Sequence, residues 1–162
     1  MHKLFVDLDG VLADFENGVR RVTGRLPHDQ PTSAMWRQLA RHPGFYEHLD
    51  WMADGRELWE YVRDLDPTIL TGLPFGRWAR PQKLTWCARE LGPDVPVITC
   101  WSRKKAETAR GLTPEGTVPV LIDDREWLGE SWEAMNGVFI HHTTASSSIA
   151  ALVTVLDGER RP

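Results

Sequence analysis

Short apolar runs alternate with longer amphipathic stretches along most of the chain. Five runs are rich in β-branched or aromatic residues and end in polar or small ones: Lys3–Leu8, Thr68–Thr71, Val95–Thr99, Val118–Ile122 and Gly137–His141. Runs this short and almost wholly apolar predict strands buried on both faces, as in a parallel sheet. Four stretches carry apolar residues at helical spacing: Arg56–Leu65, Trp78–Leu91, Glu126–Met135 and Ser146–Leu156. The alternation predicts an α/β fold with right-handed crossovers and helices on both faces of the sheet.

One interval interrupts this alternation. Between Phe15 and Ala53 the chain has three prolines, weak helical patterns and several aromatic residues, but no clear strand. We interpret it as a small helical insertion after the first strand. The predicted division is therefore a core of residues 1–14 and 54–156, an insertion of residues 15–53, and a frayed polar tail of residues 157–162.

Composition narrows the class of protein. The chain of 162 residues is long enough for one domain with a small insertion, and its 26% of charged residues is ordinary for a globular protein. The net charge of −4 argues against a dedicated nucleic-acid-binding protein, which normally has a basic face. The two cysteines have no CxxC spacing, no stretch approaches the ~20 apolar residues of a membrane span, and the first apolar run is too short for a signal peptide. We expect a cytoplasmic protein without a membrane partner.

A pair of carboxylates follows the first predicted strand. Asp7 and Asp9 are two residues apart, and Gly10 then allows a tight turn. Ligands of parallel α/β sheets bind beyond the carboxyl ends of the strands. Close carboxylates repel each other, and a divalent cation relieves this repulsion. Taken alone, the pattern fits a functional site and a solvated strand exit equally well.

A second acidic pair, Asp123 and Asp124, follows the strand predicted at 118–122. In a parallel sheet this strand ends at the same edge as Asp7 and Asp9. Four carboxylates at one edge are costly without a cation. Oxygen ligands suit Mg²⁺ and do not suit Zn²⁺, so the sequence predicts a Mg²⁺ site.

Two further strand ends carry groups that bind phosphate. Thr71 and Gly72 offer a hydroxyl and a backbone N–H. Lys104 and Lys105 follow the strand predicted at 95–99, where a lysine could neutralise a phosphate and an attacking carboxylate. Each signal is weak by itself, because threonine ends many strands and a basic run usually begins a solvated helix.

In chain order the four strand ends give Asp-x-Asp, Thr, Lys and Asp-Asp. This order resembles the haloacid dehalogenase-like (HAD) phosphohydrolase superfamily. Four segments most resemble its 5′(3′)-deoxyribonucleotidase branch: Asp7–Phe15, Gly44–Tyr46, Trp86–Pro93 and Leu121–Arg125. The resemblance extends from residue 3 to about residue 142. It implies a Rossmann-like three-layer α/β fold with a central parallel sheet and a small helical cap formed by the insertion.

The resemblance also implies catalytic roles. Asp7 would be the nucleophile that forms an aspartyl-phosphate, and Asp9 would protonate the leaving oxygen and then activate water. Thr71 and Gly72 would hold the phosphoryl group. Lys105 would balance the charge, because Ser102-Arg103-x-Lys105 aligns with the Arg-x-Lys of the branch, and Lys104 is the alternative.

The metal and the substrate pocket follow from the same resemblance. Mg²⁺ would be held by Asp7, the backbone carbonyl of Asp9, and Asp124, with Asp123 in a supporting role. The reverse assignment, with Asp123 as the ligand and Asp124 in support, stays open. A substrate base would pack against three aromatic residues of the insertion: Phe15, Phe45 and Tyr46.

We therefore expect a Mg²⁺-dependent phosphatase of small phosphomonoesters, with nucleotides among the candidate substrates and no nucleic acid polymer as a partner. One departure weakens the expectation of a nucleotide. After the threonine the branch has Ser-Pro-x-Lys, whereas Phe75 stands at the lysine position here and Arg77 is the nearest cation. Two alternatives stay open: a phosphate-binding or regulatory module of the same fold without turnover, and a phosphotransferase that uses the same aspartate.

Overall fold

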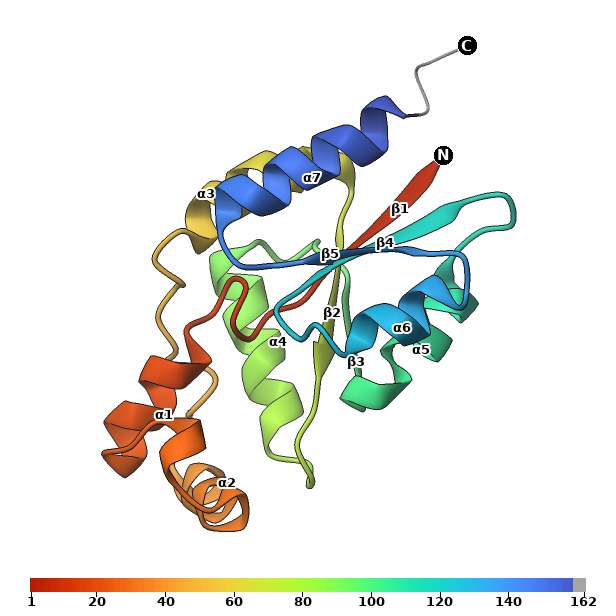
Figure 1. Ribbon diagram of the computed structural model, residues 1–162. Helices are drawn as coiled ribbons and strands as arrows, with labels where there is room; N and C mark the ends of the chain where they lie inside the picture. The colour runs from red at the N-terminus through yellow and green to blue at the C-terminus, as the bar shows by residue number, and fades with distance from the viewer. Residues whose placement is uncertain (159–162) are drawn as a thin grey trace.

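The computed structural model describes residues 1–158 and contains a five-stranded sheet covered by helices (Figure 1). The strands are β1 (His2–Val6), β2 (Thr68–Gly72), β3 (Val97–Cys100), β4 (Val118–Asp123) and β5 (Val138–His141). Their order is β3-β2-β1-β4-β5, and every neighbouring pair is parallel. The predicted α/β class, with a Rossmann-like three-layer arrangement, is confirmed.

Helices cover both faces of the sheet. They are α1 (Phe15–Thr23), α2 (Thr32–Arg41), α3 (Gly55–Val62), α4 (Ala79–Glu90), α5 (Lys105–Leu112), α6 (Leu128–Glu133) and α7 (Ala145–Asp157), with 3₁₀ turns η1 (Pro27–Asp29), η2 (Arg63–Leu65) and η3 (Ser102–Lys104). Alternate residues of β1 point to opposite faces: Leu4 and Val6 join a core that includes residues of α3, α4 and α7, whereas Phe5 joins Ala109 and Trp132 of α5 and α6.

The sequence did not predict α5. Its two buried residues are Lys105 and Ala109, so its inner face shows no large apolar residue at helical spacing. The strand limits also differ slightly: β1 ends at Val6 and β3 begins at Val97.

Strand register aligns the carboxyl ends of the strands. β1 pairs with β4 from His2↔Val118 to Val6↔Ile122, and the N–H of Asp7 donates to the carbonyl oxygen of Ile122 at 2.9 Å. On the other side of β1, Thr71 of β2 pairs with Thr99 of β3. Polar residues that follow different strands therefore meet at one edge of the sheet.

The segment with α1, η1 and α2 lies beside this edge (Figure 1). Its two connections to the rest of the chain are tied together, since Ala13 and Trp51 form a β-bridge and the N–H of Met52 donates to the Leu12 carbonyl oxygen at 2.7 Å. The Trp51 indole also donates to Glu90 of α4 at 2.7 Å. The boundaries at residues 15 and 53 stay a prediction.

Of the predicted tail, Asp157 ends α7, and residues 159–162 lie outside the described residues. Within residues 1–158, no helix combines the length and apolar character needed to cross a membrane. The cytoplasmic location stays a prediction.

Candidate active site

Three acidic side chains converge where β1 and β4 end. Asp7 directly follows β1, Asp123 is the last residue of β4, and Asp124 is next to it. One carboxylate oxygen of each lies within 4.8 Å of the others. Asp7 and Asp123 are buried, whereas Asp124 is exposed. The cluster thus has a closed side and an open side.

Lys105 neutralises the closed side of this cluster. It begins α5, and its Nζ lies 2.7 Å from Asp7 Oδ1 and 2.6 Å from Asp123 Oδ2. The side chain is only 1% exposed. Lys104, in contrast, is half exposed and pairs with Glu107. Of the two adjacent lysines, Lys105 is the one that faces the acids.

A second buried lysine, Lys83, was not singled out in the sequence. It lies on α4 and is fully buried. Its Nζ donates to Asp9 Oδ2 at 2.6 Å, to Thr71 Oγ1 at 2.8 Å and to the Gly72 carbonyl oxygen at 2.7 Å. It also lies 4.4 Å from the centre of the Tyr46 ring.

One signal could have revealed Lys83. It shares the inner face of α4 with Ala79, Trp86 and Cys87, and a lysine among buried positions of a helix needs a partner. Phe75, which stands at the lysine position of the branch, is 87% exposed. A cation thus reaches Thr71 from α4 rather than from the loop after β2.

Two glycines allow close approaches at this edge. Gly10 has φ of +78°, and a Cβ there would collide with the carboxylate of Asp124. A Cβ at Gly72 would collide with the hydroxyl of Ser102. Side chains at either position would displace groups of the site.

The acids carry more negative charge than the lysines balance. Burial, followed by the charge of Asp7, raises the pKa of Asp123 to about 7. Asp124 is exposed as a residue, but protein atoms around its carboxylate exclude part of the water, and this desolvation, followed by the charge of Asp7, raises its pKa to about 6. Burial also raises the pKa of Asp9, against the opposing effect of Lys83. Burial disfavours the charge of Lys105, but Asp7 and Asp123 outweigh this effect and raise its pKa.

This surplus fits a divalent cation. Apart from the ion pair of Asp7 with Lys105, the buried Oδ1 atoms of Asp7 and Asp9 have no polar partner among residues 1–158. A set of carboxylate oxygens is what Mg²⁺ prefers. Asp123 is already engaged, because Oδ2 contacts Lys105 and Oδ1 accepts from the N–H of Arg125 at 2.9 Å. The geometry therefore favours Asp7 and Asp124 as direct carboxylate ligands, with Asp123 in support.

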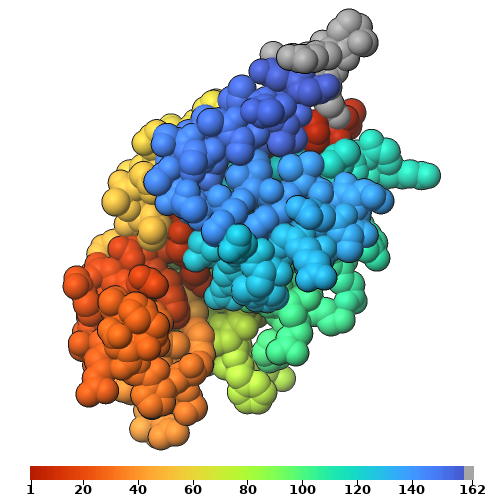
Figure 2. Space-filling model, in the orientation of Figure 1, coloured from red at the N-terminus to blue at the C-terminus, as the bar shows by residue number. Residues whose placement is uncertain are grey.

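A small cavity of about 70 Å³ adjoins the acids. Its walls come from both parts of the chain: Asp9, Gly72, Leu73, Pro74, Ser102 and Arg125 on one side, and Phe15, Trp36 and Tyr46 on the other. Figure 2 shows a hollow between the orange insertion and the cyan segment after β4. Arg125 closes one wall by donating to Ser102 Oγ at 2.8 Å. Aromatic rings thus face a charged wall across the cavity.

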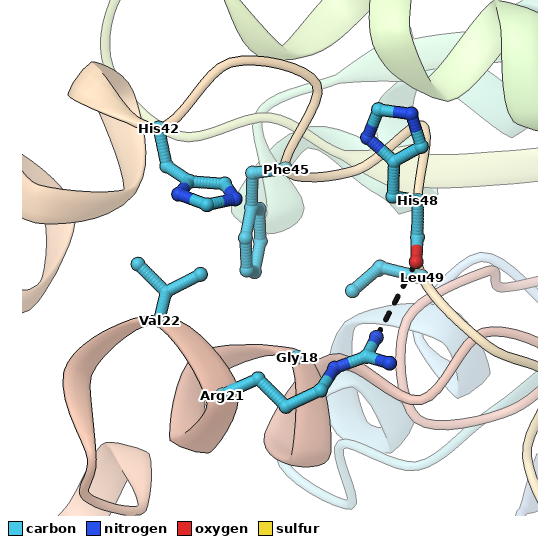
Figure 3. A pocket seen from close by; sticks show the side chains of 7 residues that line it. All are labelled: Gly18, Arg21, Val22, His42, Phe45, His48 and Leu49. Carbon is cyan, nitrogen blue, oxygen red and sulfur yellow. Dashed lines mark hydrogen bonds between the residues drawn. The ribbon is translucent and has the colours of Figure 1, made fainter.

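Phe45 does not line this cavity, unlike Phe15 and Tyr46. Its ring packs edge-on against Tyr46, with ring centres 4.9 Å apart and an interplanar angle of 74°. It instead lines a separate hollow of about 240 Å³ on the insertion, where Arg21 donates to the His48 carbonyl oxygen (Figure 3). Phe45 therefore packs against Tyr46, which lines the cavity, and does not line the cavity itself.

Comparison with known proteins gives the fold but no family. A family model described as the N-terminal domain of glutathione S-transferase matches residues 70–135, less than half of the chain. That match begins within β2 and so omits Asp7 and Asp9. No significant match was found among curated proteins.

One solved structure, of a protein from Streptococcus pneumoniae TIGR4 described as a hydrolase, is similar over nearly the whole chain. It has a TM-score of 0.55 and 15% sequence identity, and the match covers 96% of this chain and 98% of that one. At this identity the likeness concerns the fold.

Proposed function

We propose that this protein is a Mg²⁺-dependent phosphohydrolase of the HAD type that releases phosphate from small phosphomonoesters through an aspartyl-phosphate on Asp7. The observation that carries the proposal is the pairing of two buried lysines with two different aspartates, Lys105 with Asp7 and Lys83 with Asp9. Nucleophile and acid then have separate electrostatic partners. The hydrolase of similar fold agrees with this reaction class.

Asp7 is the nucleophile in this proposal. Its carboxylate attacks phosphorus, the bond to the leaving oxygen breaks, and an acyl phosphate forms. The buried ion pair with Lys105 holds the Asp7 carboxylate in place. Water then attacks the phosphorus and regenerates the carboxylate.

Asp9 is the acid and then the base. A raised pKa favours the protonated form that donates to a leaving oxygen, and the resulting carboxylate then accepts a proton from water. Lys83 holds one oxygen, Oδ2, whereas Oδ1 has no hydrogen-bond partner among residues 1–158. One oxygen is thus free for proton transfer.

The phosphoryl group would be held by Thr71 and Gly72. The Thr71 oxygen accepts from Lys83, so its O–H remains available as a donor to a phosphate oxygen. Mg²⁺, held by Asp7, Asp124 and the Asp9 carbonyl, would neutralise phosphoryl charge and orient the group.

The test is phosphate release from 4-nitrophenyl phosphate in Mg²⁺. We expect Asp7→Asn to abolish it, and Asp64→Asn, an exposed acid far along the chain, to leave it unchanged. Borohydride added to the acid-quenched reaction should reduce the acyl phosphate and leave homoserine at position 7, seen by mass spectrometry. Release that survives Asp7→Asn would contradict the proposed nucleophile.

Two other outcomes point elsewhere. Fluoroberyllate binding without turnover on a broad panel of phosphate esters would indicate a regulatory module. Transfer of the phosphoryl group to an added alcohol or sugar in preference to water would indicate a phosphotransferase. The phosphotransferase would form the same acyl phosphate on Asp7 and would also give homoserine, whereas a module that only binds fluoroberyllate would give none.

A further inference from the structure

Large exposed aromatic side chains follow several strand ends at the edge of the sheet that holds the site. Within residues 1–158, four Phe, Tyr or Trp side chains are exposed, and three of them follow strand ends: Phe75 after β2, Trp101 after β3 and Trp127 after β4. Their exposed fractions are 87%, 55% and 58%. Scattered apolar residues on a surface need no explanation, but a group around a catalytic edge does.

The loops after β2 and β3 lie directly against each other. The N–H of Leu73 donates to the Cys100 carbonyl oxygen at 2.9 Å, and Gly72 approaches the hydroxyl of Ser102. Phe75 and Trp101 therefore belong to neighbouring loops, and these loops contribute Pro74 and Ser102 to the lining of the cavity.

Basic residues accompany these two aromatic residues in the chain. Residues 73–80 and 101–104 contain four basic residues and no acid: Arg77, Arg80, Arg103 and Lys104. Arg77 and Arg103 are exposed and form no hydrogen bond or ion pair within residues 1–158. The third aromatic residue, Trp127, has acidic rather than only basic neighbours in the chain, because Asp124 and Glu126 lie close to it.

Aromatic rings interleaved with unpaired arginines bind single-stranded nucleic acid, because bases stack on the rings and phosphates bind the cations. We infer that the preferred substrate is the terminal phosphate of a short single-stranded oligonucleotide, whose next nucleotides lie along the loops after β2 and β3. The inference rests on the proposed function. The net charge of −4 argues against a dedicated nucleic-acid-binding protein, but a short strand would bring only a few phosphates into contact with local cations.

The chemistry requires no additional reactant. The terminal phosphomonoester is cleaved to inorganic phosphate and a free hydroxyl, and water supplies the oxygen and the protons. The rest of the strand provides binding energy at the aromatic rings, which raises kcat/KM for the oligonucleotide over that for a small ester.

Binding is tested without turnover. The Asp7→Asn protein in Mg²⁺ is titrated into a fluorescein-labelled deoxyoligonucleotide about ten nucleotides long, and anisotropy is followed. Separate arms carry a 5′-phosphate, a 3′-phosphate or no phosphate. We expect a phosphorylated arm to bind more tightly than the arm without phosphate. Adding Phe75→Ala or Trp101→Ala should weaken binding about tenfold each.

Trp127→Ala is the matched control, because it removes an equally exposed ring at the same edge but beside acids. We expect it to change the affinity less than about twofold. The double variant Arg77→Ala/Arg103→Ala should flatten the salt dependence of log affinity by about 0.7 for each phosphate that the two arginines bind. Equal weakening in all three aromatic variants would overturn the assignment to the loops after β2 and β3.

Activity separates this inference from the proposed function. In the protein with Asp7 intact, the ratio of kcat/KM for the phosphorylated oligonucleotide to that for 4-nitrophenyl phosphate should fall in Phe75→Ala and Trp101→Ala. Hydrolysis of the aryl phosphate without binding of any oligonucleotide overturns only the inference. A change of oligomeric state in Trp101→Ala, without loss of oligonucleotide binding, also overturns it and makes this edge a protein interface. No hydrolysis of any ester overturns the proposed function itself.

Discussion

The two buried lysines are similar in burial but differ in their partners. Lys105 contacts two carboxylates, those of Asp7 and Asp123. Lys83 contacts one carboxylate, that of Asp9, and two uncharged oxygens. The first group therefore keeps a net negative charge and the second does not. In the proposed mechanism, this difference favours a metal ion beside Asp7 and leaves Asp9 to exchange protons.

Removal of Lys105 should have the largest effect. Lys105→Met leaves two buried acids without a cation, and breaking such a pair costs about 3–5 kcal/mol of the free energy of unfolding. We expect that loss in urea denaturation, together with loss of phosphate release. Adding Asp123→Asn should restore part of the stability but none of the activity. If Lys105→Met were as stable as the parent protein, the ion pairs of Lys105 would contribute nothing to the free energy of unfolding.

Removal of Lys83 should affect catalysis through Asp9. We expect Lys83→Met to lower kcat about 10²–10⁴-fold for an alkyl phosphate, the range for loss of acid–base catalysis. The decrease should be smaller for 4-nitrophenyl phosphate, whose leaving group needs no proton. Lys104→Met, at an exposed position, serves as the control. Equal decreases on both esters would assign Lys83 a purely structural role.

Mg²⁺ should stabilise the protein by binding to the acids around Asp7, whose negative charge Lys105 does not fully balance. At a concentration of about 100 times its Kd, it should add about 2.7 kcal/mol to the free energy of unfolding. Thermal melts with and without the ion measure this gain. Asp124→Asn should abolish most of it, whereas Asp64→Asn should not. An equal gain in both variants would place the ion elsewhere.

His142 extends the comparison to a buried titratable group whose hydrogen-bond partner is a hydroxyl rather than a carboxylate. It is 5% exposed, its Nδ1 lies 2.8 Å from Ser148 Oγ, and burial lowers its pKa below 6.5. The unfolded chain therefore binds a proton first as pH falls through 6.5, so stability is full above that pH and declines below it. Urea denaturation at about pH 7.5 and 5.5 should show a smaller decline in His142→Asn. An equal decline in both proteins would exclude this histidine as the cause.

The sheet could be predicted from the sequence because its strands are apolar on both faces. A short apolar run rich in β-branched residues, such as Val118–Asp123, favours a buried strand over a helix, which is ordinarily longer. The acids at its end could be predicted for the same reason, since parallel strands end at one edge. The helix that begins at Lys105 could not, because its buried face contains a charge.

Lys83 shows why part of the site was missed. Its contacts with Asp9 and Thr71 span 74 and 12 residues along the chain. No local spacing encodes them, and a lysine within a helix is ordinarily solvated. Phe45 and Tyr46 are adjacent in the sequence, which could not show that Tyr46 lines the cavity beside the acids whereas Phe45 lines the separate hollow on the insertion.

The tie between Leu12–Ala13 and Trp51–Met52 has a mechanical consequence. The two connecting segments are bonded to each other and to α4 through Glu90, and these bonds restrict movement of the part of the chain with α1 and α2 relative to the sheet. The part of the chain with α1 and α2 should therefore melt together with the sheet in one calorimetric peak. Products would leave by side-chain rearrangement at the mouth of the cavity, on a nanosecond scale, rather than by slow opening of a lid.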